Sequence, residues 1–374
     1  MKHIFHLLSI ASLACISWSC ANVDYDKVNE ETNLPNAIYI EGAATSPVTK
    51  ITMSDDGGKG SLTPRSANLL PAAVNIKFTI DEQALKDYNE ANGTSYQVLP
   101  SQYYSLSAET MTIDANNISN GNVDVNVKPI GNELDASVKY AIPVKLASAE
   151  GCNILKSSDT KIFALDRVLN TTVMRQDGFY LKVFFEPAFQ NLQEWTMSYG
   201  IKVDNNFDNQ AVLSPDFYSR ITRDGGLQMK VGETDDPKAF AKTKLQPRKW
   251  YHIAWVYNRQ HVKCYINGVL DNEFDVPKVE TFSKLNMSWG AFKGLVREIR
   301  LYNKALSAFQ VMDNLYIETP DNPNLLFYAP LTKELGLKDV SKNPHEVNAY
   351  TPGSDDKTKY DLTKIKWEDQ KFPE

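Results

Sequence analysis

The chain has 374 residues, of which 42% are hydrophobic, 11% aromatic and 23% charged. This profile predicts a folded protein rather than a disordered one. Because single cores stop growing near roughly 250 to 300 residues, the length predicts two domains. Lys and Arg total 40 against 46 Asp and Glu, a formal charge of −6. Without a dense basic run, this balance argues against nucleic acid as a partner.

Residues 1–19 have the pattern of a secretion signal. Lys2 supplies a positive charge, residues 4–16 are almost entirely apolar, and small residues flank Cys20. The apolar stretch is shorter than the roughly 20 residues of a membrane-spanning helix. The boundary before Cys20 resembles the lipobox of bacterial lipoproteins, which implies a lipidated Cys20. Cys15 is the competing position, although cleavage there would leave a shorter apolar core.

Residues 20–35 follow as the lipidated cysteine and a polar, acidic tether that spaces the fold from a membrane. Only Cys152 and Cys264 then remain. They are too few for a disulfide scaffold, and a bond between them would cross the predicted domain boundary. We therefore expect two buried, unpaired thiols.

The first domain, residues 36–169, is predicted to be a mostly antiparallel, immunoglobulin-like β-sandwich with one short helix. Residues 37–40 open a strand. Apolar residues alternate with polar ones in three further segments, each predicted to be a strand with one buried face: 73–80, 122–128 and 140–146. The helical signal begins at Asp81 as a cap, carries Leu85 and Tyr88, and ends at Gly93.

The second domain, residues 171–374, differs by containing five tryptophans, whereas residues 36–169 contain none. Residues 250–258 are apolar on both faces, which predicts a central strand. The Asn267-Gly268 pair predicts a hairpin with a type I′ turn. Residues 306–316 have helical spacing through Phe309, Met312 and Tyr316, with Ser307 as the cap.

This second half resembles the laminin-G-like, or concanavalin A-like lectin/glucanase, superfamily. Three segments carry the resemblance, including residues 294–307, which are similar to the signature G-x-[IV]-D-E-x-R-x-Y-N-x-x-L-S. Arg297 stands where that family usually has Asp. The other two segments are 195–198 and the positions Trp250, His252 and Ala254 with the 265–268 hairpin. Residues 325–341 also resemble the closing strand of these domains. The resemblance implies a concanavalin A-like jelly roll, so the fold class is all-β with two sandwich domains.

The first half resembles the domain-of-unknown-function 1735 family of Bacteroidota surface lipoproteins. The matching positions are Tyr88-Asn89, Gly93, Tyr96, Leu99-Pro100, Tyr104 and residues 140–144. That family often precedes laminin-G-like or glycoside hydrolase domains beside glycan-uptake machinery. The resemblance implies a lipid-anchored protein on the outer membrane, facing the cell exterior, with glycan and an outer-membrane glycan transporter as partners.

Glycanases on this fold use paired carboxylates as nucleophile and general acid. Residues 273–278 begin like their E-x-D-x-x-E strand, but Lys278 replaces the last Glu and Pro277 would interrupt a central strand. We therefore expect Glu273 and Asp275 to be solvated charges, and we predict no catalytic residue. His252 and His261 lack partners at ligand spacing, so both are predicted to be structural.

A possible calcium site lies in residues 204–208, where Asp204, Asn206 and Asp208 supply oxygen ligands. Such Asx-rich loops are more often plain turns, and that alternative stays open. No other cofactor is expected.

Sugar binding needs exposed aromatic faces next to polar side chains. We expect at least two of Trp195, Trp250 and Trp255 to be core residues. The candidate glycan-binding residues therefore lie in loops: Asp216, Tyr218 and Arg220 beside Phe217, and Trp289 with Phe292 near Asn286 and Lys293. The predicted function is non-catalytic glycan binding. The alternatives are a module that docks a partner protein and, less favoured, a glycoside hydrolase.

Overall fold

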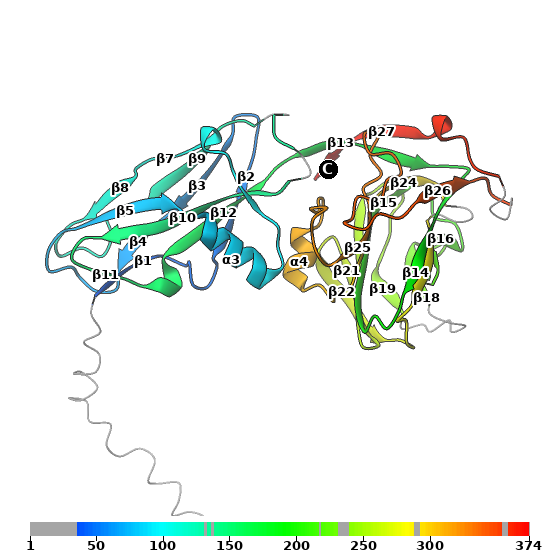
Figure 1. The fold of residues 1–374 in the computed structure, drawn as a ribbon, viewed down its shortest axis with the longest axis horizontal. Helices are drawn as coiled ribbons and strands as arrows, with labels where there is room; N and C mark the ends of the chain where they lie inside the picture. The colour runs from blue at the N-terminus through cyan, green and yellow to red at the C-terminus, as the bar shows by residue number, and fades with distance from the viewer. Residues whose placement is uncertain are drawn as a thin grey trace, which may run out of the picture.

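The computed structural model describes residues 36–130, 133–135, 138–216, 218–230, 239–287, 292–353 and 358–373. Two β-sandwiches lie end to end (Figure 1). Each sheet takes its strands from one half only, either from β1–β12 or from β13–β27. The predicted all-β fold class is confirmed, and the sheets divide between Asp166 and Leu169.

The N-terminal half is a sandwich of mixed sheets. One sheet has the order β2-β12-β10-β5-β8 with β6 beside β10, and two smaller sheets have the orders β11-β1-β4 and β3-β9-β7. The strands are β1 (Ala37–Ile40), β2 (Val48–Thr52), β3 (Gly58–Leu62), β4 (Pro64–Ser66), β5 (Val74–Ile80), β6 (Gln97–Val98), β7 (Tyr104–Leu106), β8 (Thr110–Ile113), β9 (Val123–Val127), β10 (Tyr140–Ala149), β11 (Asn153–Ile154) and β12 (Thr160–Asp166). Short 3-10 turns are η1 (Ser101–Tyr103) and η2 (Lys156–Ser158).

The predicted alternation is confirmed in β5 and β9, which bury every second side chain. Strand β10 differs, because Ala141 and Pro143 on its second face are buried as well. Helix α3 (Glu82–Asn92) covers that face and packs Leu85 against Ala141. A half-buried strand was therefore the wrong prediction for β10, since a helix covers its other side.

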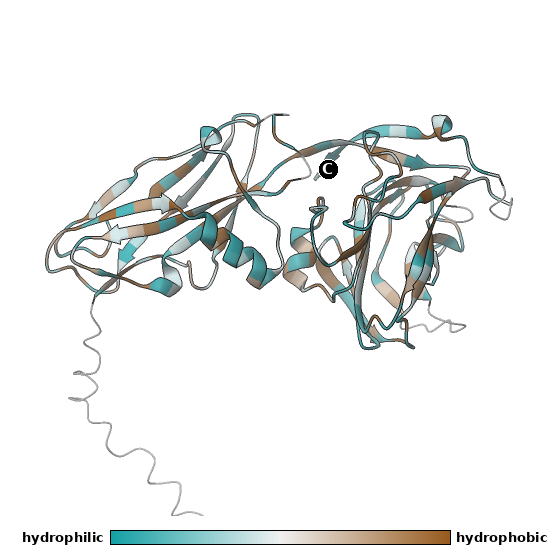
Figure 2. Cartoon of the chain, in the orientation of Figure 1, coloured by the Kyte–Doolittle hydropathy of each residue, from teal (hydrophilic) through white to brown (hydrophobic). Residues whose placement is uncertain are grey.

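Helix α3 begins and ends where the sequence predicts. The Asp81 side chain accepts a hydrogen bond from the amide of Ala84, and Gly93 ends the helix in the left-handed conformation at φ 61°. A left-handed residue is inexpensive only for glycine, which lacks a Cβ. Most of the helix is hydrophilic (Figure 2), so its helical state depends on these caps and on the single buried Leu85.

The C-terminal half is a two-layer sandwich. The proximal sheet, which carries β20 and β24, has the order β22-β21-β20-β15-β24-β13-β27 with β25 beside β24; the distal sheet has the order β19-β18-β17-β16-β23-β14-β26. The strands are β13 (Leu169–Gln176), β14 (Tyr180–Phe189), β15 (Glu194–Val203), β16 (Gln210–Pro215), β17 (Tyr218–Ile221), β18 (Gly226–Lys230), β19 (Phe240–Lys244), β20 (Tyr251–Asn258), β21 (His261–Ile266), β22 (Val269–Asp275), β23 (Phe282–Met287), β24 (Gly294–Tyr302), β25 (Leu325–Ala329), β26 (Val347–Tyr350) and β27 (Lys366–Phe372), with the turn η3 (Leu362–Lys364).

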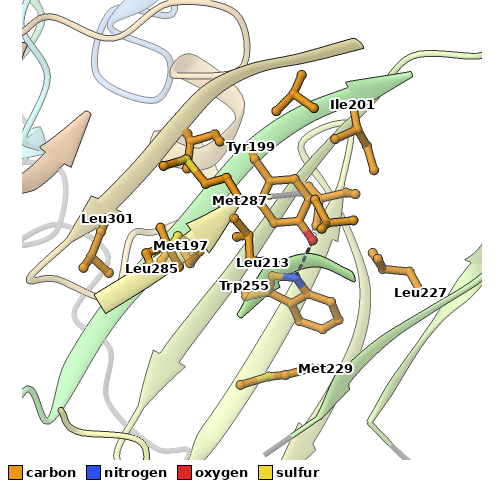
Figure 3. Close-up of a cluster of buried hydrophobic side chains, with 14 of the residues drawn as sticks. Met197, Tyr199, Ile201, Leu213, Leu227, Met229, Trp255, Leu285, Met287 and Leu301 are labelled. Carbon is orange, nitrogen blue, oxygen red and sulfur yellow. Dashed lines mark hydrogen bonds between the residues drawn. The ribbon is translucent and has the colours of Figure 1, made fainter. Parts of the chain in front are cut away.

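Aromatic side chains fill the space between these sheets. Strand β20 lies between β15 and β21, as its apolar pattern predicts, and Trp195 and Trp255 are fully buried. The Trp255 indole donates a hydrogen bond to the Tyr199 hydroxyl at 3.2 Å (Figure 3). Tyr199 is also 2.7 Å from the hydroxyl of Ser219 on β17, so a polar contact joins the two sheets inside the core.

The predicted hairpin and second helix are present. Asn267 and Gly268 both have positive φ, as a type I′ turn requires. Helix α4 (Ala308–Asp313) is capped by Ser307 through a capping box with Gln310. Its buried residues are Gln310 and Val311, whereas Phe309 and Met312 are exposed. The predicted helical spacing therefore did not identify the buried face.

The outer face of the proximal sheet carries a buried ionic cluster. The Glu298 carboxylate contacts the guanidinium of Arg300 and accepts a hydrogen bond from the Tyr328 hydroxyl at 2.8 Å. Arg297 contributes a contact to Glu298 at 3.3 Å. Glu298 has φ 55° at a bulge opposite β15, which turns its side chain into the cluster. The signature residues 297–302 therefore hold this face together.

Polar side chains join the two halves where α3 and α4 approach each other (Figure 1). The Lys139 ammonium lies 2.7 Å from the Asp313 carboxylate, which also accepts a hydrogen bond from the Tyr96 hydroxyl. The Gln310 side chain donates to the carbonyl of Asn92 at 2.7 Å. These contacts bury charged groups at the junction of the halves.

Two further findings concern the predicted thiols and membrane segments. Cys152 and Cys264 are both unpaired, with Cys264 buried and Cys152 partly buried. Of the residues described, no helix has the length and apolar character needed to cross a membrane. Cys20 and Cys15 lie outside the described residues.

Candidate functional site

Strand pairing gathers polar side chains on the outer face of the distal sheet. Asn348, Lys182, Asn286 and Ser214 are in register across β26, β14, β23 and β16. Paired residues point to the same side of a sheet. The neighbouring residues Leu181, Leu213, Leu285 and Met287 point the other way, into the core. This face therefore presents a row of polar groups on the side away from the core.

Tyr218 and Arg220 extend the row onto β17. Ser219 and Ile221 of this strand are buried, so Tyr218 and Arg220 share the outer face. Both donate to one acceptor, Asn209 Oδ1, at 2.8 Å from the Tyr218 hydroxyl and 3.1 Å from Arg220 Nη1. Arg220 Nε also donates to Gln228 Oε1 at 2.6 Å. These bonds fix a phenol ring and a guanidinium beside each other.

Two polar atoms on this face have no hydrogen-bond partner. The Ser214 hydroxyl and the Asn286 carbonyl oxygen are buried without a partner. Lys182, beside Asn286, holds its ammonium 4.8 Å from the centre of the partly exposed Phe184 ring. Buried polar atoms normally find partners, so these two atoms are unusual on this face.

Strand pairing brings Tyr218 and Arg220, two of the predicted glycan-binding residues, near Asn286, which flanks the second predicted group. Strand β17 carries Tyr218 and Arg220, strand β23 carries Asn286, and both pair with β16. The sequence could not show this, because the groups are about 70 residues apart and only sheet pairing brings them together. Phe217 and Trp289 lie outside the described residues.

Two predicted residues have structural roles. The Asp216 carboxylate accepts hydrogen bonds from the Ser283 amide at 2.6 Å and the Lys284 amide at 2.9 Å, so it fastens the end of β16 to β23. Phe292 is only 2% exposed and packs in the core of the sandwich. The prediction that Phe292 contacts a ligand is therefore wrong, because its ring has no accessible face.

The predicted calcium ligands are dispersed. Asp204 is paired with Arg175 at 2.9 Å, and the Asn206 side-chain amide donates to the carbonyl of Leu245 at 2.8 Å. Asp208 is exposed. The pKa of Arg175 is raised by its hydrogen bond to Glu368 and further by Asp204. Within the described ranges, no group of three His, Cys, Asp or Glu side chains could hold a metal ion.

The carboxylates that resemble a glycanase pair lie on an exposed edge strand. Glu273 and Asp275 of β22 are 52% and 85% exposed, and they flank His261 at 3.4 and 2.8 Å. The hydrogen bond that His261 donates to Asp275, followed by the one to Glu273, raises the pKa of His261 although its partial burial opposes the shift. These carboxylates are solvated, as expected.

Sequence reasoning missed Asn209, Gln228 and Lys182. Gln228 and Lys182 lie in strands that the sequence analysis did not predict. Asn209 has φ 58°, a conformation in which asparagine is enriched, and a turn before a strand could have signalled it. Their roles depend on pairing between strands, which a local pattern does not reveal.

The C-terminal half is thus a sandwich of two large antiparallel sheets, with polar side chains on the outer face of the distal sheet. Residues 179–312 match the family model of the Concanavalin A-like lectin/glucanases superfamily. Residues 32–152 match a second family model, described as an N-terminal domain. The predicted layout, an N-terminal domain followed by a concanavalin A-like domain, is confirmed.

Several solved structures are similar to this chain. A "putative carbohydrate binding protein" from Bacteroides ovatus is 20% identical, with 84% of this chain and 97% of that chain covered and a TM-score of 0.48. EndoBT-3987 of Bacteroides thetaiotaomicron, solved with a Man5GlcNAc product, is 20% identical over 35% of this chain and 30% of its own, at a TM-score of 0.28.

A pentraxin of Limulus polyphemus is 15% identical, with 38% of this chain and 80% of that chain covered and a TM-score of 0.31. No curated protein matches the chain. Similarity at these values carries no functional argument.

Proposed function

We propose that the protein is a non-catalytic glycan-binding protein that binds sugar on the outer face of the distal sheet. The observation that carries the proposal is the shared acceptor Asn209, which holds Tyr218 and Arg220 side by side on β17. An aromatic ring next to hydrogen-bonding groups suits a pyranose, which has an apolar face and a rim of hydroxyls.

Rigidity supports this proposal. Ser219, between Tyr218 and Arg220, is fully buried and contacts the Tyr199 hydroxyl in the core. The strand that carries both side chains is thus held in place by a contact on its core-facing side. Tyr218 and Arg220 therefore have little side-chain entropy left to lose on binding. Asn286 belongs to the same proposed site, since β23 and β17 both pair with β16.

The proposal extends to the setting of the protein. A signal pattern followed by Cys20 supports a lipoprotein anchored to the bacterial outer membrane and facing outward, with a glycan transporter as a partner. In that setting the N-terminal sandwich spaces the glycan-binding domain from the membrane. Metabolic labelling with a palmitate analogue tests the lipid anchor. The wild-type protein should carry the label, and the Cys20→Ala variant should not.

A glycan panel tests the binding proposal. Residues 21–374 are screened against host and plant glycans, and each hit is measured by calorimetry with calcium and then with chelator. Tyr218→Ala and Arg220→Ala should each weaken binding at least about tenfold, which corresponds to roughly 1.4 kcal/mol. Arg223→Ala is the matched control, because Arg223 is exposed on the adjoining turn.

Full affinity in both variants would refute the site, and no binding across the panel would refute the function. A hit that is lost on chelation would show that binding requires a divalent cation. Release of reducing ends from any bound glycan would refute the non-catalytic proposal.

Docking of a partner protein is the second candidate function. One observation favours it: Val269 and Leu270 on the edge strand β22 are 63% and 46% exposed, and Met312 of α4 lies over the adjoining Gly268. Exposed apolar residues at a sheet edge are suited to protein contact. If the panel gives no hit, cross-linking at Leu270 in cells tests this candidate.

A further inference from the structure

A glycine separates two polar side chains on the outer face of the proximal sheet. His252 of β20 pairs with Gly200 of β15, and Gly200 pairs with Arg297 of β24. Paired residues share a face, so the imidazole and the guanidinium flank a position without a side chain. Glycine inside a strand often marks a close approach by a ligand or another chain.

Both flanking side chains have unused hydrogen-bonding capacity. Among the described residues, neither ring nitrogen of His252 nor Arg297 Nε has a hydrogen-bond partner, although His252 is 7% and Arg297 3% exposed. Leaving a buried polar atom without a partner is costly, so three such atoms together need an explanation. Burial, followed by the charges of Arg300 and Arg297, lowers the pKa of His252, which keeps the imidazole neutral.

These groups line a cavity of about 250 Å³. The cavity walls include the rings of Trp250, Tyr316 and Phe372, and Lys249 also lines it. The volume lies below the roughly 300–1,000 Å³ of sites for drug-sized ligands, so it suits a molecule of one ring. A polymer would need an open groove instead.

The charge of the lining is positive. Arg297 and Lys249 line the cavity, and no Asp or Glu is among its described lining residues. Glu298, the nearest carboxylate to Arg297, is also bound to Arg300, so it is shared between two guanidinium groups. The unpartnered donor Arg297 Nε therefore has no anion of its own.

We propose that this cavity binds a small carboxylate-bearing ligand of one-ring size, namely an acidic monosaccharide unit. The carboxylate would accept hydrogen bonds from Arg297 Nε and His252, and the apolar face of the ring would lie against Trp250 or Tyr316. The cavity is on the proximal sheet, so this inference does not depend on the glycan site proposed on the distal sheet.

Calorimetry of residues 21–374 with galacturonate, galactose and benzoate tests the proposal. We expect galacturonate to bind at least about tenfold more tightly than galactose, since charge-assisted hydrogen bonds are roughly twice as strong as neutral ones. Benzoate distinguishes an acidic sugar from any small aromatic acid: tighter binding of benzoate than of galacturonate would overturn the assignment to a sugar. The indole NMR signal of Trp250 should shift during the titration.

Two variants locate the ligand. Gly200→Ala adds a Cβ that would lie 3.0 Å from Arg297 Cγ, displacing the guanidinium, and should abolish binding. Lys249→Ala removes an exposed cation and carries little risk to folding. It should weaken the binding of galacturonate several-fold and leave the binding of galactose unchanged. Lys86→Ala on α3 is the control. Equal affinity for acid and neutral sugar, or no saturable binding of galacturonate, would overturn the proposal.

Discussion

The Lys139 ammonium of the N-terminal half lies 2.7 Å from the Asp313 carboxylate at the end of α4, and the two side chains are only 9% and 3% exposed. This is a buried ion pair between the halves. Each charge is compensated only while the halves stay docked, since separation would hydrate both groups and remove the Tyr96 hydrogen bond to Asp313. The pair therefore couples the two sandwiches.

Replacing Lys139 with Ala should lower the free energy of unfolding by about 3–5 kcal/mol, because the Asp313 carboxylate would remain buried without its cation. Urea denaturation measures the change. Lys59→Ala is the control, because the Lys59–Asp124 pair is largely exposed and should contribute less than about 1 kcal/mol. A loss no larger in Lys139→Ala than in Lys59→Ala would contradict the coupling.

The same pair has a predictable pH dependence. Burial alone would raise the pKa of Asp313, but the charge and hydrogen bond of Lys139 outweigh it and lower the pKa below 3.8. A lowered folded-state pKa means that the stabilisation is present above the unfolded value and is lost as pH falls through the folded one. Asp313→Asn should therefore be less sensitive to pH below about 4 than the wild type, in denaturation curves collected from pH 2 to 5.

Replacing Gly93 with alanine should lower the free energy of unfolding more than the same replacement at Gly151, which is also in the left-handed conformation. A Cβ at Gly93 would lie 2.4 Å from Gln310 Nε2 across the junction, whereas one at Gly151 meets nothing within 4 Å. Gly151→Ala should cost about 1 kcal/mol from backbone strain alone. Gly93→Ala should cost more, and equal losses of unfolding free energy would show that the Gln310 contact contributes nothing.

Glu298 should be essential for the proximal sheet. Glu298→Gln removes the anion shared by Arg297 and Arg300 and should cost about 3–5 kcal/mol, because two buried guanidinium groups lose their counter-charge. Glu346→Gln is the matched control, since Glu346 is 79% exposed. A thermal unfolding midpoint that is the same in both variants would contradict this role.

His261 should give a small stabilisation that depends on pH. Its pKa is raised above 6.5, mainly by the hydrogen bond that its ring donates to the Asp275 carboxylate. The stabilisation is therefore fully present below about pH 6.5 and is lost as pH rises through the folded-state pKa. Because its side chain is 43% exposed, we expect less than about 1 kcal/mol.

An NMR titration of the His261 ring measures this pKa directly. Asp275→Asn should move it toward 6.5, and an unchanged midpoint would show that the 2.8 Å contact does not stabilise the imidazolium.

Local sequence patterns predicted much of the fold. Alternation identified β5 and β9, a two-sided apolar segment identified β20, and the end residues of α3 were set by Asp81 and Gly93. These features depend on interactions between residues close in sequence, so one stretch of chain contains the information. The signature at residues 294–307 likewise lies within one stretch of chain, so it could indicate the concanavalin A-like superfamily from sequence alone.

The candidate sites depended on pairing between distant strands. Tyr218 and Asn286 are brought to one face only because β17 and β23 both pair with β16, and Phe292 is buried by residues far along the chain. Likewise, His252 and Arg297 flank a cavity only because Gly200 lies between them in register.

The sequence by itself thus determined the element types, their caps and the two-part β layout, since these follow from local hydrogen bonding and periodic burial. Only the tertiary structure decided which polar side chains face solvent, which are buried at the junction of the halves, and which share a cavity. Strand register and sheet order set those distances, and both arise from contacts between residues separated by tens of positions in the chain.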